Sequence, residues 1–149
     1  MKRVILLLLL FAPLLSLGQD EDFLGVNQAI NNYFEGYVNR DIDKLKAGFH
    51  IEAGAMKRVM YSDEGKQSIM IYPFDELIPA WAKGKPRRQE VIANSKLEVL
   101  SIDITDKQIA SAKIKMIVGD KGYTDVLSLH KINGVWKITD KMFTTFDVD

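Results

Sequence analysis

Few side chains in this sequence have the chemistry of a catalytic or metal-binding group. The chain contains no cysteine, which excludes disulfides, thiol catalysis and thiolate metal ligands. Its two histidines, His50 and His130, have no further histidine or paired carboxylates at the spacing of metal ligands. There is also no glycine-rich phosphate loop and no nucleophile elbow. We therefore assign no catalytic residue, no metal and no cofactor.

His50 directly follows a predicted helix, and two interpretations of it stay open. At the entry of a cavity it would act as a general base or bind a ligand. Alternatively, it caps the carbonyl groups at the C-terminus of that helix. His130 alternates with the apolar face of its predicted strand, so we expect it to face solvent or a partner subunit.

Two aspartates lie in phase with the apolar face of a predicted strand. Asp125 is two residues after Tyr123, so both side chains lie on the same face of their predicted strand. In the next predicted strand, Asp140 is four residues after Trp136 and is likewise expected on the same face as it. A buried carboxylate must be hydrogen-bonded, ion-paired or protonated, and Lys57 is the expected partner for one of the two. Both aspartates are predicted to be polar anchors of an apolar ligand cavity, unless they lie at strand ends within reach of water.

Aromatic side chains follow the inward stripes of two predicted helices. Tyr33 and Tyr37 lie on the first of them, and Phe74 and Trp81 lie on the other. These rings either stack on a flat ligand or pack in the core. The candidate ligand pocket therefore comprises Tyr33, Tyr37, His50, Lys57, Trp81, Tyr123, Asp125 and Asp140.

The N-terminus has the pattern of a secretory signal. Lys2 and Arg3 precede an apolar run over residues 4–15, which small residues follow up to Gly18. This run is shorter than the roughly 20 residues of a membrane-spanning helix. We predict a signal peptide over 1–18 and one domain over 19–149, located in the periplasm or secreted and free of the membrane. An uncleaved anchor is the alternative.

Charge argues against a nucleic-acid partner. Without Lys2 and Arg3, the mature chain has slightly fewer basic than acidic residues, whereas nucleic-acid binding needs a strong positive field. One basic cluster, over residues 83–88, is either a solvated loop or a surface for an acidic ligand or partner.

The elements that must position these residues follow from hydrophobic spacing. Helices are predicted over 23–38, from Asp41 to Phe49 and after Pro73, and strands over 55–61 and 67–72. Four longer strands are predicted over 91–104, 108–118, 122–132 and 135–146. A change of phase after Val99 indicates a β-bulge. The order predicts an α+β fold in which three helices of the N-terminal half cover the concave face of a strongly curved, mostly antiparallel sheet.

This order resembles the NTF2-like superfamily, and within it the secreted family called putative lumazine-binding. The segments that carry the resemblance are 33–37, 41–45, 49–53 and 123–138. The resemblance implies a cone-shaped domain and a homodimer formed through the outer face of the sheet. The family name implies a pteridine-like ligand.

The resemblance also tests one enzymatic mechanism. Ketosteroid isomerases of this superfamily carry a catalytic aspartate on the first strand of the hairpin, inside the cone. Aligning Asp41 and Phe49 with the landmarks of that branch places Lys57 at the aspartate position. A protonated lysine abstracts no proton unless burial lowers its pKa by several units. The isomerase mechanism is therefore not supported.

Three functions remain open at this point. We favour a noncatalytic domain that binds a small planar or apolar molecule in its cone. The second is a lyase or isomerase of the SnoaL or ketosteroid-isomerase kind that uses His50 or Asp125 as its base. The third is a structural or protein-interaction module whose cone is filled by its own side chains.

Overall fold

The computed structural model describes residues 16–148. Most of the predicted signal segment, residues 1–18, lies outside this range, and its last residues form the first turn of a helix. Within 16–148, no helix is both long and apolar enough to cross a membrane.

Four helices and a β-hairpin come first in the described chain, and four longer strands follow them. The helices are α1 (Ser16–Asn39), α2 (Ile42–Gly48), α3 (Phe74–Ala82) and α4 (Gln89–Asn94). The strands are β1 (Ala55–Tyr61), β2 (Gln67–Pro73), β3 (Lys96–Thr105), β4 (Ile109–Val118), β5 (Lys121–Ile132) and β6 (Val135–Asp147). The α+β order expected from hydrophobic spacing is confirmed.

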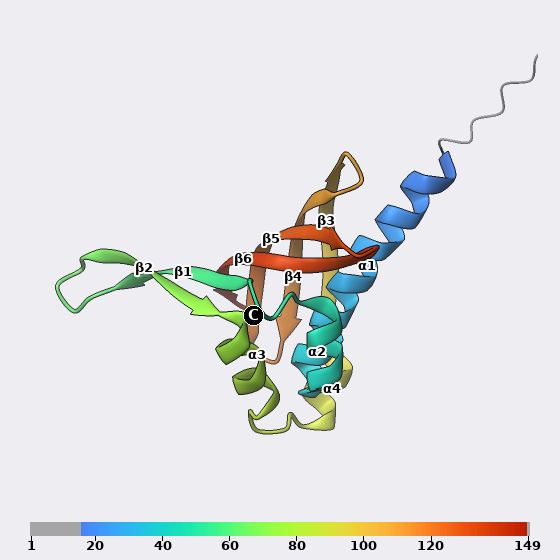
Figure 1. The fold of residues 1–149 in the computed structure, drawn as a ribbon. Helices are drawn as coiled ribbons and strands as arrows, with labels where there is room; N and C mark the ends of the chain where they lie inside the picture. Colours follow the sequence, from blue (N-terminus) through green and yellow to red (C-terminus); the bar gives the residue numbers. More distant parts are fainter. Residues whose placement is uncertain (1–15, 149) are drawn as a thin grey trace, which may run out of the picture.

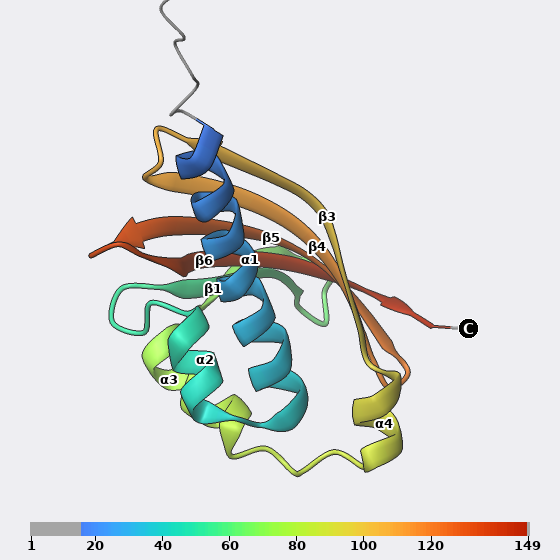
Figure 2. The same ribbon diagram turned by 90° about the vertical axis from the view of Figure 1, so that its right-hand side faces the viewer.

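The strands form one curved sheet in the order β2-β1-β6-β5-β4-β3. All neighbours are antiparallel except β1 and β6, which run parallel. The sheet bends around α1, so α1 lies along its concave face with α2 and α3 beside it (Figure 2). The β1–β2 hairpin extends away from this body (Figure 1).

Apolar side chains from the helices and from the concave face of the sheet form one core. Burying each large apolar side chain contributes about 1.5–3 kcal/mol, so this layer contact holds the helices on the sheet. The largest fully buried side chains are Val26, Ile30, Tyr33, Leu45, Phe49, Phe74, Ile78, Ile114, Met116, Leu127, Leu129 and Ile138.

The predicted start of the first long strand is wrong. Residues 91–94 were expected to begin this strand, but they belong to α4 although Val91 and Ile92 are β-branched, and β3 begins at Lys96. The amide of Ile92 donates to the carbonyl of Arg88, and that of Ser95 donates to the carbonyl of Ile92. These local hydrogen bonds outweigh the strand preference of the two side chains.

Two β-bulges curve the sheet. In β3 the pairing with β4 shifts between Val99 and Ser101, which confirms the bulge predicted from the change of phase. The second bulge lies in β6. Ser128 pairs with Asp140 while Leu129 pairs with Ile138, so Thr139 is an extra residue. Beyond Thr139, the residues of β6 that face the core change from even to odd numbers.

The N-terminal half of α1 is attached to the β5–β6 hairpin by a polar contact. α1 begins at Ser16, earlier than the predicted residue 23, so Asp22 lies within the helix and is buried. Its Oδ1 accepts hydrogen bonds from Lys131 Nζ at 2.7 Å and from Trp136 Nε1 at 3.1 Å. The hydrogen bond from Lys131 is the main cause that lowers the pKa of Asp22, against the opposing effect of burial.

This contact predicts a pH dependence of stability. Because the folded-state pKa of Asp22 lies below its ordinary value of 3.8, its carboxylate stabilises the fold above that pH. The contribution is lost as the pH falls through the lowered pKa. We expect Asp22→Asn to be less stable than the wild type at neutral pH, with the difference shrinking below pH 3.8 in urea denaturation.

The matched control for this experiment is Glu21→Gln, because Glu21 is the exposed neighbour of Asp22. It should unfold like the wild type at every pH. A stability difference for Asp22→Asn that stays constant down to strongly acidic pH would contradict the role given to the carboxylate.

Candidate functional site

Three charged or polar side chains meet in the interior between α1 and the sheet. Lys141 Nζ lies 2.7 Å from Asp125 Oδ1, and the Tyr33 hydroxyl donates to Asp125 Oδ2 at 2.8 Å. Asp125 has no exposed surface, and Tyr33 and Lys141 are each 2% exposed. Within residues 16–148, Asp125 Oδ1 has no partner other than the ammonium group of Lys141. We call these three residues the inner layer.

Three partly buried aromatic rings lie directly beside the inner layer. The ring centroids of Tyr37 and Tyr123 are 6.2 Å apart, and those of Tyr123 and Phe143 are 6.4 Å apart. The hydroxyl oxygens of Tyr37 and Tyr123 are separated by 3.5 Å. We call Tyr37, Tyr123 and Phe143 the outer layer, because all three keep some exposed surface.

Each of three elements supplies one residue to each layer. On α1 the two tyrosines are four residues apart, which is one helical turn and therefore one face. On β5, Tyr123 and Asp125 are two residues apart and share the concave face, as do Lys141 and Phe143 on β6. The two layers are therefore a direct consequence of helix and strand periodicity.

Burial raises the pKa of two tyrosines of the site, Tyr33 and Tyr123. It is the largest cause that raises the pKa of Tyr33, and the charge of Asp125 adds to it. Burial is also the largest cause that raises the pKa of Tyr123, and the hydrogen bond with Tyr37 raises it further. Both phenols are therefore hydrogen-bond donors at neutral pH rather than bases.

Lys141 has two opposing influences on its charge. Burial lowers the pKa of Lys141, and the neighbouring carboxylate of Asp125 counteracts this effect. The ammonium group also lies 4.4 Å from the centroid of the Phe143 ring, within cation–π range. The ring of the outer layer thus stabilises the cation of the inner layer.

The deeper interior is filled by aromatic rings. Phe49 packs edge-on against Phe74 with centroids 4.7 Å apart and against Tyr33 at 5.0 Å. Trp81, a predicted pocket residue, stacks on Tyr33 at 6.0 Å. Of the two possibilities left open for these rings, stacking on a ligand or packing in the core, Phe74 and Trp81 show packing in the core.

Two predicted pocket residues face the other side of the sheet, so the expectation that they point into the cone is wrong. Asp140 pairs with exposed Ser128, because the extra residue Thr139 reverses the alternation of β6. Lys57 lies beside exposed Met142 in the parallel β1–β6 pair. The expected ion pair of Lys57 with an aspartate does form, and its partner is Asp140. Asp125 is paired with Lys141 instead.

Neither histidine lies in the two layers. The Nδ1 atom of His50 accepts a hydrogen bond from the amide of Ala53 at 3.3 Å, in the turn after α2. The expected capping of helix carbonyls by His50 is therefore wrong for its side chain. His130 is exposed, as predicted, and its Nδ1 lies 2.7 Å from the Thr139 hydroxyl. Among residues 16–148, no cluster of three or more histidine, aspartate or glutamate side chains is placed to hold a metal ion.

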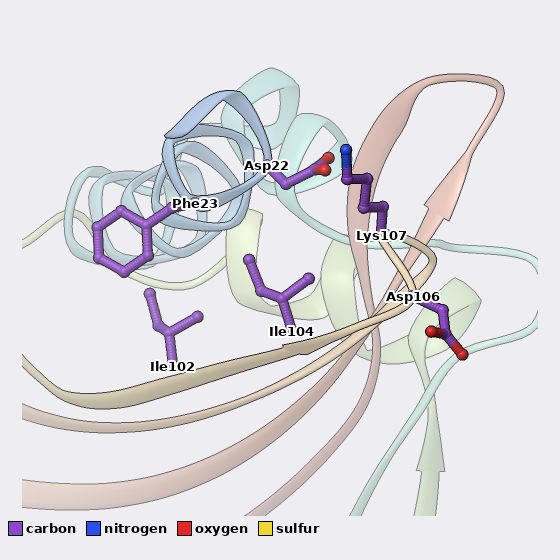
Figure 3. A pocket seen from close by; sticks show the side chains of 6 residues that line it. All are labelled: Asp22, Phe23, Ile102, Ile104, Asp106 and Lys107. Atoms are coloured by element: carbon purple, nitrogen blue, oxygen red, sulfur yellow. The ribbon is translucent and has the colours of Figure 1, made fainter. Parts of the chain in front are cut away.

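A separate cavity of about 430 Å³ lies between the N-terminal half of α1 and β3. Figure 3 shows Phe23 on one side of it and Ile102 and Ile104 on the other, while Asp22 and Lys107 point toward each other at one end. None of the predicted pocket residues lines this cavity.

Lys141 and Phe143, both on β6, are the residues of the two layers that the sequence prediction missed. The sequence contains a sign of the bulge that brings Lys141 inside. The apolar residues Trp136 and Ile138 are at even positions and Phe143 is at an odd one, as expected when an extra residue lies between them. The same signal identified the bulge in β3. In β6 it is weaker, since Met142 continues the original phase.

Residues 21–144 match the model of the family described as "Putative lumazine-binding". Among curated proteins, none matches this chain. The fold resembles that of an NTF2-like protein of unknown function from Shewanella baltica, with 19% identity over 85% of this chain and 95% of that chain and a TM-score of 0.68.

Two further solved structures give the same result. An NTF2-like protein of unknown function from Silicibacter pomeroyi has 16% identity, coverage of 86% and 98%, and a TM-score of 0.66. A ketosteroid isomerase-like protein from Erwinia carotovora atroseptica has 14% identity, coverage of 87% and 98%, and a TM-score of 0.58. Similarity at this level establishes the fold, which confirms the predicted NTF2-like architecture, and it does not establish an activity.

The inner layer predicts a large effect of removing one partner of the ion pair. Lys141→Met leaves the carboxylate of Asp125 buried without a cation, which costs about 3–5 kcal/mol of unfolding free energy. The double variant Asp125→Leu/Lys141→Met removes both charges and should recover only part of this loss, because it leaves the buried Tyr33 hydroxyl without its acceptor. Urea denaturation measures both effects.

The control is Lys113→Met, since Lys113 is exposed on β4 and should change stability by less than about 0.5 kcal/mol. Unchanged stability of Lys141→Met would show that Asp125 does not need the ammonium group and would contradict the ion pair.

Proposed function

Because the chain belongs to the NTF2-like family described as "Putative lumazine-binding", we propose that it binds a small planar molecule against its outer layer without transforming it. Tyr37, Tyr123 and Phe143 present partly exposed rings from three elements. Such rings stack on a flat molecule, and phenol hydroxyls next to them supply hydrogen bonds that fix its orientation.

The observation that carries this proposal is the position of a buried ion pair directly beside partly exposed aromatic rings. A buried ion pair is often less stabilising than apolar side chains of the same volume. Stability alone therefore does not account for Asp125 and Lys141. Polar groups that converge on an aromatic surface are typical of ligand sites.

Binding without turnover agrees with the state of the inner groups. Tyr33 stays a protonated donor to Asp125, and Lys141 neutralises the same carboxylate. A general base must be free to take a proton at the operating pH, and an ion-paired carboxylate at the bottom of the site is poorly suited to that role. The N-terminal signal pattern supports a location in the periplasm or outside the cell.

The outer, convex face of the sheet supports a homodimer as part of this proposal. Exposed apolar residues are adjacent there across four strands, around the Lys57–Asp140 ion pair. A two-fold axis that passes close to the Lys57–Asp140 pair would place Lys57 of one copy near Asp140 of the other, so such a contact would be complementary in charge. The apolar residues are Val59, Ile69, Ile71, Val126 and Met142.

Ligand binding is tested first by native mass spectrometry of the protein purified under mild conditions, then by fluorescence titration with lumazine. Tyr37→Ala and Tyr123→Ala should each weaken lumazine binding by about tenfold or more, because each removes a stacking ring. Tyr61→Ala is the matched control, since Tyr61 is 66% exposed on the β1–β2 hairpin.

An equal loss of binding in Tyr61→Ala would place the ligand elsewhere. The absence of both a co-purifying small molecule and lumazine binding would overturn the proposed function.

The dimer is tested by sedimentation. Met142→Lys and Ile71→Lys introduce charge at the centre of the apolar face and should weaken dimerisation by about 30-fold or more. Val135→Lys is the control, because Val135 is similarly exposed but lies at the β5–β6 turn. A wild-type protein that sediments as a monomer at high concentration would contradict the proposal.

A further inference from the structure

Arg40 adopts a backbone conformation that is costly for an arginine. α1 ends with a hydrogen bond from the amide of Asp41 to the carbonyl of Gly36, and Arg40 between them has a φ of 62°. This is the position after a helix where glycine or asparagine is usual. Backbone strain of this kind is concentrated at functional sites. The observation directs attention to what the Arg40 side chain does.

The Arg40 side chain lies over the outer layer with part of its hydrogen-bonding capacity unused. Its Cζ is 5.3 Å from the centroid of the Tyr37 ring, and its Nη1 donates to the carbonyl of Trp81 at 3.1 Å. Its Nε is buried and has no hydrogen-bond partner. Gly84 makes room for the guanidinium, since a Cβ there would lie 3.0 Å from Cζ of Arg40.

A second guanidinium lies against the same ring. Arg87 Cζ is 4.5 Å from the centroid of Tyr37, and its Nη1 donates to the carbonyls of Tyr37 and Val38 at the end of α1. Both arginines therefore use only Nη1 in the hydrogen bonds of the described chain. Arg87 comes from the basic segment 83–88 that the sequence singled out.

The two cations have no carboxylate to balance them. None of the ion pairs within residues 16–148 includes Arg40 or Arg87. Burial, followed by the charge of Arg87, lowers the pKa of Arg40. Like charges held together in a partly buried place repel each other, and an anion between them would remove the repulsion.

We propose that Arg40 and Arg87 bind the anionic group of the ligand, and that the ligand is a planar small molecule carrying a carboxylate or another oxyanion. The inference rests on the proposed function, since it assigns the chemistry of a molecule bound at the outer layer. Guanidinium groups suit this role because their N–H donors match the geometry of oxyanions. The planar part of the ligand contacts the rings of the outer layer, and its oxyanion lies beside the Tyr37 ring, against which both guanidinium groups pack.

Two probes with the same ring system test this assignment: naphthalene-2-carboxylate, and naphthalene-2-carboxamide, in which a neutral NH₂ group replaces one charged oxygen. Binding is followed by NMR of the purified protein, with the arginine Nε–H resonances as the local signal. The wild type should bind the carboxylate at least about tenfold more tightly than the amide at low salt. The reason is that a hydrogen bond between two charged groups is stronger than one to a neutral group. High salt should reduce this preference.

Variants assign the preference to the two arginines. Arg40→Asn keeps a residue that tolerates the positive φ, and Arg87→Gln keeps a hydrogen-bond donor. Each should bring the affinity ratio of the two probes close to one. Arg88→Gln, in the same loop and exposed, should leave the ratio unchanged. Because the ratio is measured within each variant, a general loss of stability does not imitate the effect.

Each outcome decides a different claim. If carboxylate and amide bind equally to the wild type, the proposed function stands and the anionic ligand is overturned. The same follows if the carboxylate preference survives in both Arg40→Asn and Arg87→Gln. If neither probe binds but lumazine does, the anionic ligand is overturned and the proposed function stands. If lumazine also fails to bind and no small molecule co-purifies, both are overturned.

Discussion

The extra residue in β6 determines which side chains of this protein lie inside and which lie outside. Thr139 has no partner in β5, so the residues on either side of it alternate in opposite phase. Without it, Asp140 would face the core and Lys141 would face solvent, and Asp125 would have no cation. The inner ion pair and the Lys57–Asp140 pair on the outer face therefore depend on the same local irregularity.

The charges around the outer layer are arranged asymmetrically. On the inner side the single carboxylate of Asp125 is matched by Lys141, whereas on the α1 side two guanidinium groups lie on the Tyr37 ring. All three cations are adjacent to aromatic faces, which stabilise positive charge through the ring quadrupole. The aromatic rings thus allow unbalanced positive charge to be held in partly buried surroundings.

Regular periodicity was enough to predict much of the fold and two of the three residues of the inner layer, Tyr33 and Asp125. Asp125 was placed on the inner face correctly, because β5 alternates without interruption from Tyr123 to Leu127. Asp140 was placed on the wrong face because a bulge changes the alternation without any distinctive residue type. The sequence also leaves the partner of a buried carboxylate undetermined, since Lys57 and Lys141 have the same chemistry and only the register separates them. Arg40 was missed because its role depends on tertiary contacts and a positive φ.

The β1–β2 hairpin has a consequence for handling the protein. β2 is the last strand on its side of the sheet, so one row of its backbone amides and carbonyls has no strand to pair with. Its register with β1 runs without a shift, and Ile69 and Ile71 are both more than half exposed. Natural proteins usually blunt such a strand with a bulge, a proline or charge, and here only Pro73 at its end serves that purpose. Unless another surface covers it, this strand is the place from which concentrated protein would begin to aggregate.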